Sequence, residues 1–108
     1  MGPRRLVVWM ISVYITCKNS AEAKKIAKYL LSKRLIACAN IFPAESIFRW
    51  RGKIVEQKEA AMLCKARKKD FEAIEKEVKR LHSYKVPCIT AFEWARSSRE
   101  FSEWVEKT

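Results

Sequence analysis

The only histidine of the chain, His82, is the first residue that could do chemistry. It lies within residues 81–87, between a charged stretch with helical periodicity and an apolar stretch. The residue before a proline favours extended backbone, so the helix is predicted to end by Val86. An imidazole at such a junction can bind a metal or handle a proton. It can also be no more than a polar residue in a helix-ending turn.

The cysteines are the other candidate ligands, and there are four of them: Cys17, Cys38, Cys64 and Cys88. No two are spaced as C-x-x-C, which excludes a zinc ribbon or a thioredoxin-type motif. Cys38 and Cys64 fall in the middle of predicted strands, where buried cysteine behaves as a small hydrophobic residue. The spacings do not resemble a secreted disulfide framework, so the sequence predicts a cytoplasmic protein.

Several common functions lack the residues that they need. Only Gly2 and Gly52 are glycines, so neither a Walker-type phosphate loop nor a dinucleotide fingerprint can be built. No serine or cysteine nucleophile motif accompanies the histidine, and no enzymatic activity is predicted. The basic and apolar residues near the N-terminus lack a small-x-small cleavage pattern. The apolar run there is also much shorter than the roughly 20 residues that a membrane-spanning helix needs, so no membrane partner is expected.

The charge of the chain is strongly positive, with 23 Lys and Arg against 12 Asp and Glu and a net charge of +11. Such a charge points to an acidic partner, either nucleic acid or anionic lipid. The alternative is a solvated surface crossed by salt bridges. The basic residues are spread along the chain, and the densest cluster, 65–69, lacks the interleaved aromatics of single-strand binders. We therefore expect only weak, non-specific nucleic-acid binding.

The first half of the chain predicts one helix and three strands. A strand is expected at 6–16, followed by a helix that begins at Asn19 with Glu22 three residues later, as in a capping box. A second strand runs from about 35 to 50, and Pro43 within it implies a bulge or an edge position. Arg51 and Gly52 then form a hairpin turn, and a third strand covers 53–66.

The second half predicts a helix, a strand and a short final helix. Asp70 is the expected N-cap of a helix that ends near Leu81. A fourth strand covers 87–94. The last helix is expected to begin at a capping box formed by Ser97 and Glu100. Its inward-facing residues are predicted to be Phe101, Trp104 and Val105.

The order of these elements is βαββαβ followed by a short C-terminal helix. This order predicts a single domain over 1–108 with an α+β, ferredoxin-like fold. Its second and third strands form a long hairpin that carries Phe48 and Trp50 beyond the reach of two short helices. Exposed aromatics on an overlong hairpin indicate a surface between subunits.

This topology also brings candidate ligands together. The first and last strands are antiparallel neighbours, so the end of the first, near Cys17, lies close to the start of the last, near Cys88. His82 precedes that last strand, and the three side chains could converge. Thiolate and imidazole ligands suit copper or zinc better than magnesium or calcium. Two alternatives stay open: Cys17 and Cys88 could be packing residues, or they could form a disulfide.

Three segments together resemble the CutA family of divalent-cation tolerance proteins. They are residues 30–41, residues 46–56 with Glu59, and residues 82–87 followed later by Phe101 and Trp104. The resemblance covers nearly the whole chain in the right order. It implies a ferredoxin-like subunit assembled as a homotrimer through its hairpins, with clefts like those of the PII signalling proteins. It also implies a link to divalent-metal tolerance and binding of copper or similar heavy-metal ions.

The chain departs from the family pattern at several positions. Lys85 and Cys88 stand where the family usually has glutamate, and Ser83 replaces a proline. Arg51 and Val55 stand where acidic residues are common. Each change removes an oxygen ligand or adds positive charge, which disfavours a carboxylate-based site for a hard divalent ion.

The expected subunit cleft is a second candidate site. Its lining residues would be Trp50, Lys53, Glu56, Glu59 and Tyr84, although ordinary interface packing would explain them equally well. Three functions remain open. The first is a trimeric metal-binding protein with no catalytic step, and the second is a PII-like regulator that binds a small ligand or a partner protein. The third is a basic nucleic-acid-binding module that uses the helix-free face of the sheet.

Overall fold

The computed structural model describes residues 9–108, so the part of the predicted first strand at 6–8 lies outside the described residues. The predicted α+β fold is confirmed, with the expected order of elements. They are β1 (Met10–Cys17), α2 (Ser20–Ser32), β2 (Cys38–Trp50), β3 (Lys53–Arg67), the 3-10 turn η1 (Lys68–Asp70), α3 (Phe71–Leu81), β4 (Ile89–Glu93) and α4 (Arg99–Lys107).

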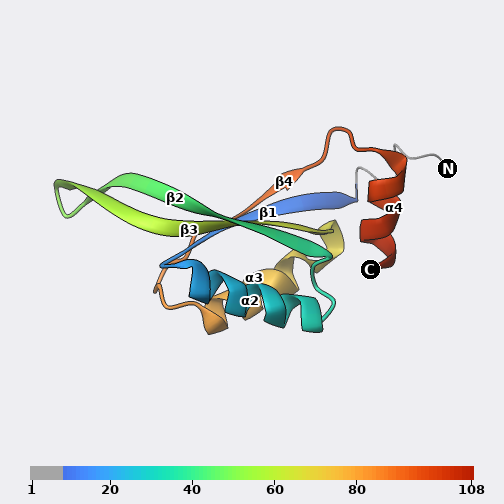
Figure 1. The fold of residues 1–108 in the computed structure, drawn as a ribbon, viewed down its shortest axis with the longest axis horizontal. Coiled ribbons are helices and arrows are strands. Elements are labelled where there is room, and N and C mark those ends of the chain that lie inside the picture. The colour runs from blue at the N-terminus through green and yellow to red at the C-terminus, as the bar shows by residue number, and fades with distance from the viewer. Residues whose placement is uncertain (1–8) are drawn as a thin grey trace.

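The strands form one antiparallel sheet in the order β2-β3-β1-β4. Helices α2 and α3 cover one face of this sheet, and α4 stands at the end where β1 begins (Figure 1). Alternate residues of β1 point toward the two helices, as the twofold repeat of a strand requires. The side chains of Val13, Ile15 and Cys17 are fully buried there against residues such as Ile26 and Ile74. No helix among residues 9–108 is long and apolar enough to cross a membrane.

The β2–β3 hairpin is the longest feature of a molecule whose extents are 51 × 26 × 21 Å. Its outer part projects past the helices as an arm (Figure 1). The predicted turn is confirmed, because Arg51 and Gly52 both have positive φ, 51° and 77°, as a two-residue hairpin turn demands. Pro43 lies in the edge strand β2, opposite Ala60. Of the two predicted alternatives, a bulge or an edge position, the structure shows the edge position.

Two of the three predicted N-cap residues are confirmed in position, and the third differs by one residue. Asn19 does cap α2, because its Oδ1 accepts the backbone N–H of Glu22 at 2.9 Å. Asp70 occupies the N-cap position of α3 as predicted, but its side chain makes no capping hydrogen bond: its backbone (φ −93°, ψ 0°) is not extended, and its carboxylate pairs with Arg67 at 2.9 Å. The cap of α4 is Ser98, whose extended backbone places Oγ to accept the N–H of Phe101.

Fewer residues of α4 face the core than predicted. Val105 is buried, but Phe101 and Trp104 are 36% and 47% exposed. They continue a row of stacked rings that begins at Trp94, with centroids 5.7 and 5.8 Å apart. The expectation that both aromatics face the core was wrong, because this row runs along the outside of α4.

Candidate metal centre at the end of the first strand

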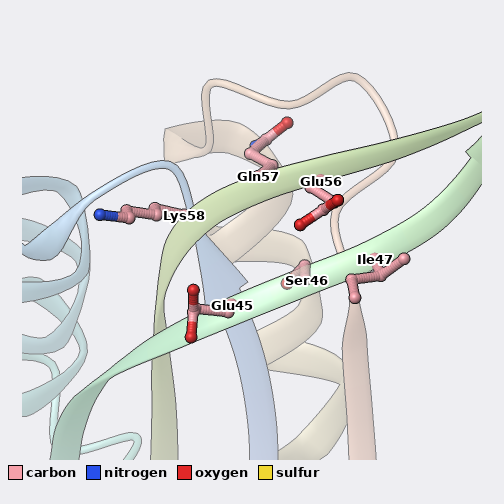
Figure 2. A pocket seen from close by; sticks show the side chains of 6 residues that line it. All are labelled: Glu45, Ser46, Ile47, Glu56, Gln57 and Lys58. Carbon is pink, nitrogen blue, oxygen red and sulfur yellow. The ribbon is translucent and has the colours of Figure 1, made fainter.

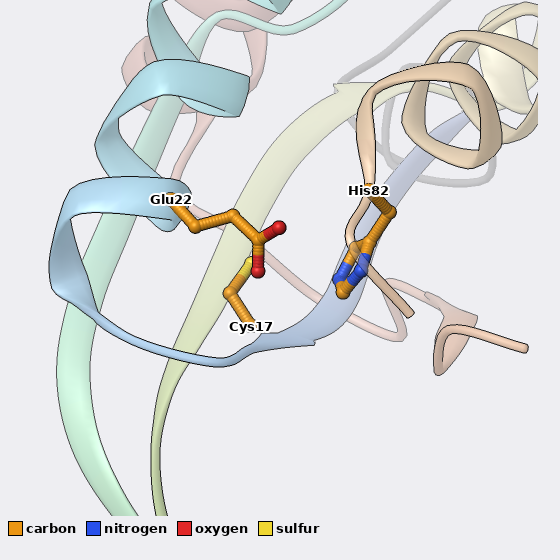
Figure 3. Close-up of side chains that lie close together, drawn as sticks. All are labelled: Cys17, Glu22 and His82. Atoms are coloured by element: carbon orange, nitrogen blue, oxygen red, sulfur yellow. The ribbon is translucent and has the colours of Figure 1, made fainter. Parts of the chain in front are cut away.

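Three elements meet where β1 ends. Strand β1 carries Cys17 into the core, α2 begins three residues later, and α3 ends just before His82. One ligand atom from each of Cys17, Glu22 and His82 lies within 4.8 Å of the others, with Cys17 buried and the other two partly buried. Figure 3 shows the three side chains, one from each element, directed toward the same point. This group is called the base cluster below.

The His82 ring uses both of its nitrogens. Its Nδ1 accepts the backbone N–H of Tyr84 at 3.0 Å, so Nε2 carries the proton and donates it to the carbonyl of Thr16 at 2.8 Å. This arrangement fixes the orientation of the ring and its tautomer. It also ties the segment after α3 to the end of β1.

The Glu22 carboxylate is equally occupied. Its Oε1 accepts the backbone N–H of Lys18 at 3.0 Å, and its Oε2 accepts that of Ser83 at 2.8 Å. Burial by itself would raise the pKa of Glu22, but the hydrogen bonds from Lys18 and Ser83 outweigh it and lower the pKa. Glu22 is therefore an anion that joins α2 to a residue 61 positions along the chain.

The Cys17 thiol is held in its protonated form. Burial raises its pKa to about 12, and the nearby charges of Glu22 and Glu59 act in the same direction. A metal that binds here must displace this proton, because the thiolate is the ligand. Sulfur, imidazole nitrogen and one carboxylate oxygen together form a soft-to-borderline donor set, which fits copper or zinc.

Cys88 lies outside the base cluster. Strand pairing ends with Ile15 opposite Ile89, so Cys88 comes one residue before β4, next to Thr16 rather than to Cys17. Neighbouring positions along a strand point to opposite faces of the sheet. Cys88 is exposed, and its sulfur lies 3.9 Å from the hydroxyl of Thr90. All four cysteines are free, so the structure does not contain the disulfide that was left open.

The five expected cleft residues divide into separate groups. Tyr84 donates to the carboxylate of Glu59 at 2.5 Å, and its ring lies 4.8 Å from that of His82, next to the base cluster. Trp50 and Lys53 face each other at the tip of the hairpin. Lys53 and Glu59 are six positions apart along β3, or about 20 Å. One chain therefore does not bring the five together.

The remaining cleft residue, Glu56, lies in a shallow hollow on the arm. The hollow has a volume of about 440 Å³ and is lined by both strands of the hairpin (Figure 2): Glu45, Ser46, Ile47, Glu56, Gln57 and Lys58. Five of its six lining residues have polar side chains, and none of them offers a thiol or imidazole ligand.

Sequence reasoning missed Glu22 as a member of the base cluster. The sequence marked it as the glutamate of a capping box, which is a local role. The available signal was its position: Glu22 follows Cys17 by five residues, in the first turn of a helix that starts where the strand ends. A carboxylate at that position necessarily lies near the end of the strand.

Comparison with known proteins gives a consistent result. The family model described as CutA1 divalent ion tolerance protein matches residues 11–108. The divalent-cation tolerance protein CutA of Archaeoglobus fulgidus is 47% identical over 96 residues, which cover 89% of this chain and 94% of that protein. The Thermus thermophilus protein of the same name is 41% identical over 96 residues, covering 88% and 93%.

Solved structures agree with these sequence matches. The periplasmic divalent cation tolerance protein CutA from Archaeoglobus fulgidus superposes with a TM-score of 0.89 at 45% identity, covering 91% of this chain and 96% of that one. CutA1 from Oryza sativa gives a TM-score of 0.90 at 32% identity and covers 94% of each chain. The resemblance expected from the three sequence segments is thereby confirmed, and this chain belongs to the CutA1 family of divalent ion tolerance proteins.

Proposed function

We propose that this protein is a homotrimeric tolerance protein that binds copper or a similar heavy-metal ion at the base cluster and performs no catalytic step. The observation that carries the proposal is the convergence of Cys17, Glu22 and His82, whose ligand atoms lie within 4.8 Å of one another. The donor set supports copper and zinc over magnesium and calcium, which prefer oxygen ligands.

The hydrogen bonds of the base cluster define what binding must change. The metal replaces the proton of the Cys17 thiol, and the His82 ring gives up one of its two hydrogen bonds. Glu22 is already ionised and needs no deprotonation. Binding therefore competes with protons and weakens as the pH falls.

Cys88 remains in the proposal as a second thiol, six residues after His82 and exposed. Its sulfur faces solvent in the single chain, so its contribution is separable from that of Cys17. The Cys88→Ser variant measures that contribution directly.

The homotrimer is supported by what the arm exposes. Ile47, Trp50 and Ile54 are 68%, 58% and 74% exposed, and β2 and β4 are the two edges of the sheet. Unpaired edges and exposed apolar side chains are the features that a partner subunit covers. A neighbouring arm could also bring Trp50 and Lys53 against Tyr84 and Glu59, which is how the expected subunit cleft would form.

The experiment is a calorimetric titration of the purified, metal-free protein with Cu²⁺, Zn²⁺ and Mg²⁺. Native mass spectrometry of the metal-bound protein then gives its stoichiometry and oligomeric state. Wild type should bind copper and zinc but not magnesium. Cys17→Ser and His82→Ala should each weaken copper binding, whereas Cys64→Ser, a buried thiol elsewhere in the core, should not. Unchanged copper affinity in a variant that lacks Cys17, His82 and Cys88 would refute the site.

A second candidate is the PII-like regulator, and the observation that favours it is the polar hollow beside Glu56. Because the hollow lies on the arm, a trimer would place it near a subunit boundary. A small ligand there should raise the melting temperature of wild type but not that of Glu56→Gln. If screening small anions and nucleotides raises neither melting temperature, this candidate fails.

A cytoplasmic location is the remaining part of the proposal. Four free thiols support it, because thiols persist in reducing compartments. The solved relative from Archaeoglobus fulgidus is described as periplasmic, and the Arabidopsis thaliana relative as chloroplastic. Fractionation of the native cells with an antibody against the chain tests the location.

A further inference from the structure

Nearly half of the net positive charge lies in and next to one helix, α2. Residues 18–34, which contain α2, hold six basic residues and one acidic one, nearly half of the net charge of +11. The acidic residue is Glu22, whose carboxylate is occupied by the backbone N–H groups of Lys18 and Ser83. The charge of α2 is therefore hardly compensated within its own segment.

The lysines of α2 share one face. The exposed residues of the helix are Ser20, Ala21, Lys24, Lys25, Lys28, Leu31 and Ser32. At 3.6 residues per turn these positions fall within an arc of roughly 140°. Within residues 9–108, no carboxylate forms an ion pair with Lys24, Lys25 or Lys28. We call the surface of these three residues the lysine face.

Some of the other basic side chains of the described chain are paired with carboxylates. In α3, Lys79 pairs with Glu75 at 3.0 Å and Arg80 with Glu77 at 2.7 Å. The cluster at 65–69, which is the densest in the sequence, is partly paired. There Arg67 contacts Asp70, Lys68 contacts Glu93, and Lys65 donates to the side chain of Asn40. Density along the sequence is thus a poor guide to free charge.

We propose that the lysine face binds the phosphate backbone of double-stranded nucleic acid without reading its sequence. Charge complementarity carries this proposal, because a row of unpaired ammonium groups along one helix matches the regular negative charge of a duplex. Lysine offers a point charge rather than the planar fork by which arginine reads guanine, so phosphates are contacted and bases are not.

The same face argues against two other polyanions. The apolar side of α2 is wholly used in the core, since Ala23, Ile26 and Leu30 are 0% exposed. Only Leu31, at 40%, remains for insertion into a bilayer, and a membrane-surface helix needs a broad apolar face. No aromatic residue stands among the exposed positions to stack unpaired bases, which disfavours single strands.

The test is fluorescence anisotropy with a short labelled duplex of scrambled sequence, titrated at several salt concentrations between about 50 and 200 mM. The variant replaces Lys24, Lys25 and Lys28 with glutamine, which keeps helix propensity. A control of equal net charge replaces Lys68, Lys69 and Lys107, which lie elsewhere on the surface. Melting curves confirm that both variants fold.

At the lowest salt concentration the lysine-face variant should bind the duplex at least about tenfold more weakly than wild type. The slope of the logarithm of its binding constant against the logarithm of salt concentration should be smaller in magnitude by about 3. The control should stay close to wild type, and a second duplex of different sequence should bind equally. An equal loss in both variants would overturn the proposal, since binding would then follow net charge alone. Binding to anionic lipid vesicles with no binding to duplex would overturn it in favour of a membrane surface.

Discussion

The base cluster and the arm are neighbours along strand β3, and they differ in what their polar and apolar groups contact. Cys17 lies opposite Ala60, at the middle of β3, and the arm is formed by the first half of β3 with the facing part of β2. In the base cluster, both His82 nitrogens and both Glu22 oxygens have hydrogen-bond partners within the chain, and Cys17 is fully buried. On the arm, Ile47 and Ile54 are mostly exposed, and no buried cluster of residues 9–108 includes them. The contacts of the base cluster are thus made within the single chain, whereas the apolar side chains of the arm are left to solvent.

This difference separates stability from assembly. Substitutions in the base cluster remove contacts that a single chain makes, so their cost appears in the free energy of unfolding. Substitutions on the arm remove contacts that only an oligomer could make, so their cost appears in dissociation. A base-cluster substitution that changed only dissociation, or an arm substitution that changed only the free energy of unfolding, would contradict this separation.

The largest effect is expected for Trp50→Ala on the arm. Central aromatics at interfaces contribute roughly 2–4 kcal/mol, so the variant should raise the dissociation constant of the oligomer by about 30-fold or more. Analytical ultracentrifugation over a range of protein concentrations measures this. Trp9→Ala is the control, because Trp9 is about as exposed, at 52%, but lies far from the arm. Equal effects of both substitutions, or a monomeric wild type, would contradict the role of the arm.

The second effect is expected for His82→Ala in the base cluster. The substitution leaves the partly buried carbonyl of Thr16 and the N–H of Tyr84 without partners, which costs about 1–3 kcal/mol for each unsatisfied group. Urea unfolding at constant protein concentration measures the loss. Lys85→Ala, an exposed change in the same segment, should cost less than about 0.5 kcal/mol. A His82→Ala variant as stable as wild type would show that these bonds are not structural.

The same contrast explains how far the sequence could predict the molecule. The arm could be predicted from residues that are close together in the sequence. The Arg51-Gly52 turn and the two alternating strands beside it define its length, and both are confirmed. The base cluster depends on register between distant segments. A difference of one residue between β1 and β4 decides which face Cys88 takes. The bond from Ser83 to Glu22 spans 61 positions and has no local signature.

The ends of the helices show the same limit on a smaller scale. Ser97 and Ser98 are both good caps by type, and only backbone geometry selects Ser98. Asp70 has the right type as well, but a salt bridge with Arg67 takes its carboxylate. Residue type predicts that a helix begins nearby, whereas competing tertiary contacts decide which residue caps it.

A third prediction concerns pH and the buried thiols. Burial raises the pKa of Cys17 and of Cys64 to about 12, from 9.0 for an unperturbed thiol. Between these two pH values the unfolded chain loses a proton that the folded chain keeps, so the free energy of unfolding falls as the pH rises. The slope reaches about 1.4 kcal/mol per pH unit for each thiol. Below pH 9 this stability is fully present.

Urea unfolding from about pH 8 to pH 11 measures that slope for wild type, Cys17→Ala and Cys64→Ala. Each variant should flatten the profile, because one of the two protected thiols is gone. Parallel profiles for wild type and Cys17→Ala would show that Cys17 is less buried than its position at the end of β1 requires.

The smallest effect is expected at the tip of the arm, for Gly52→Ala. Gly52 has φ +77° and no atom within 4 Å of an added Cβ, so the cost is backbone strain alone. We expect about 1 kcal/mol, the usual penalty for placing a side chain in the left-handed region. Gly52→Asn should cost less, because asparagine tolerates this region. If the arm is ordered mainly by neighbouring subunits, the cost should appear in the dissociation constant measured by ultracentrifugation. A loss of stability at protein concentrations where only monomer is present would instead mean that the arm is held by its own chain.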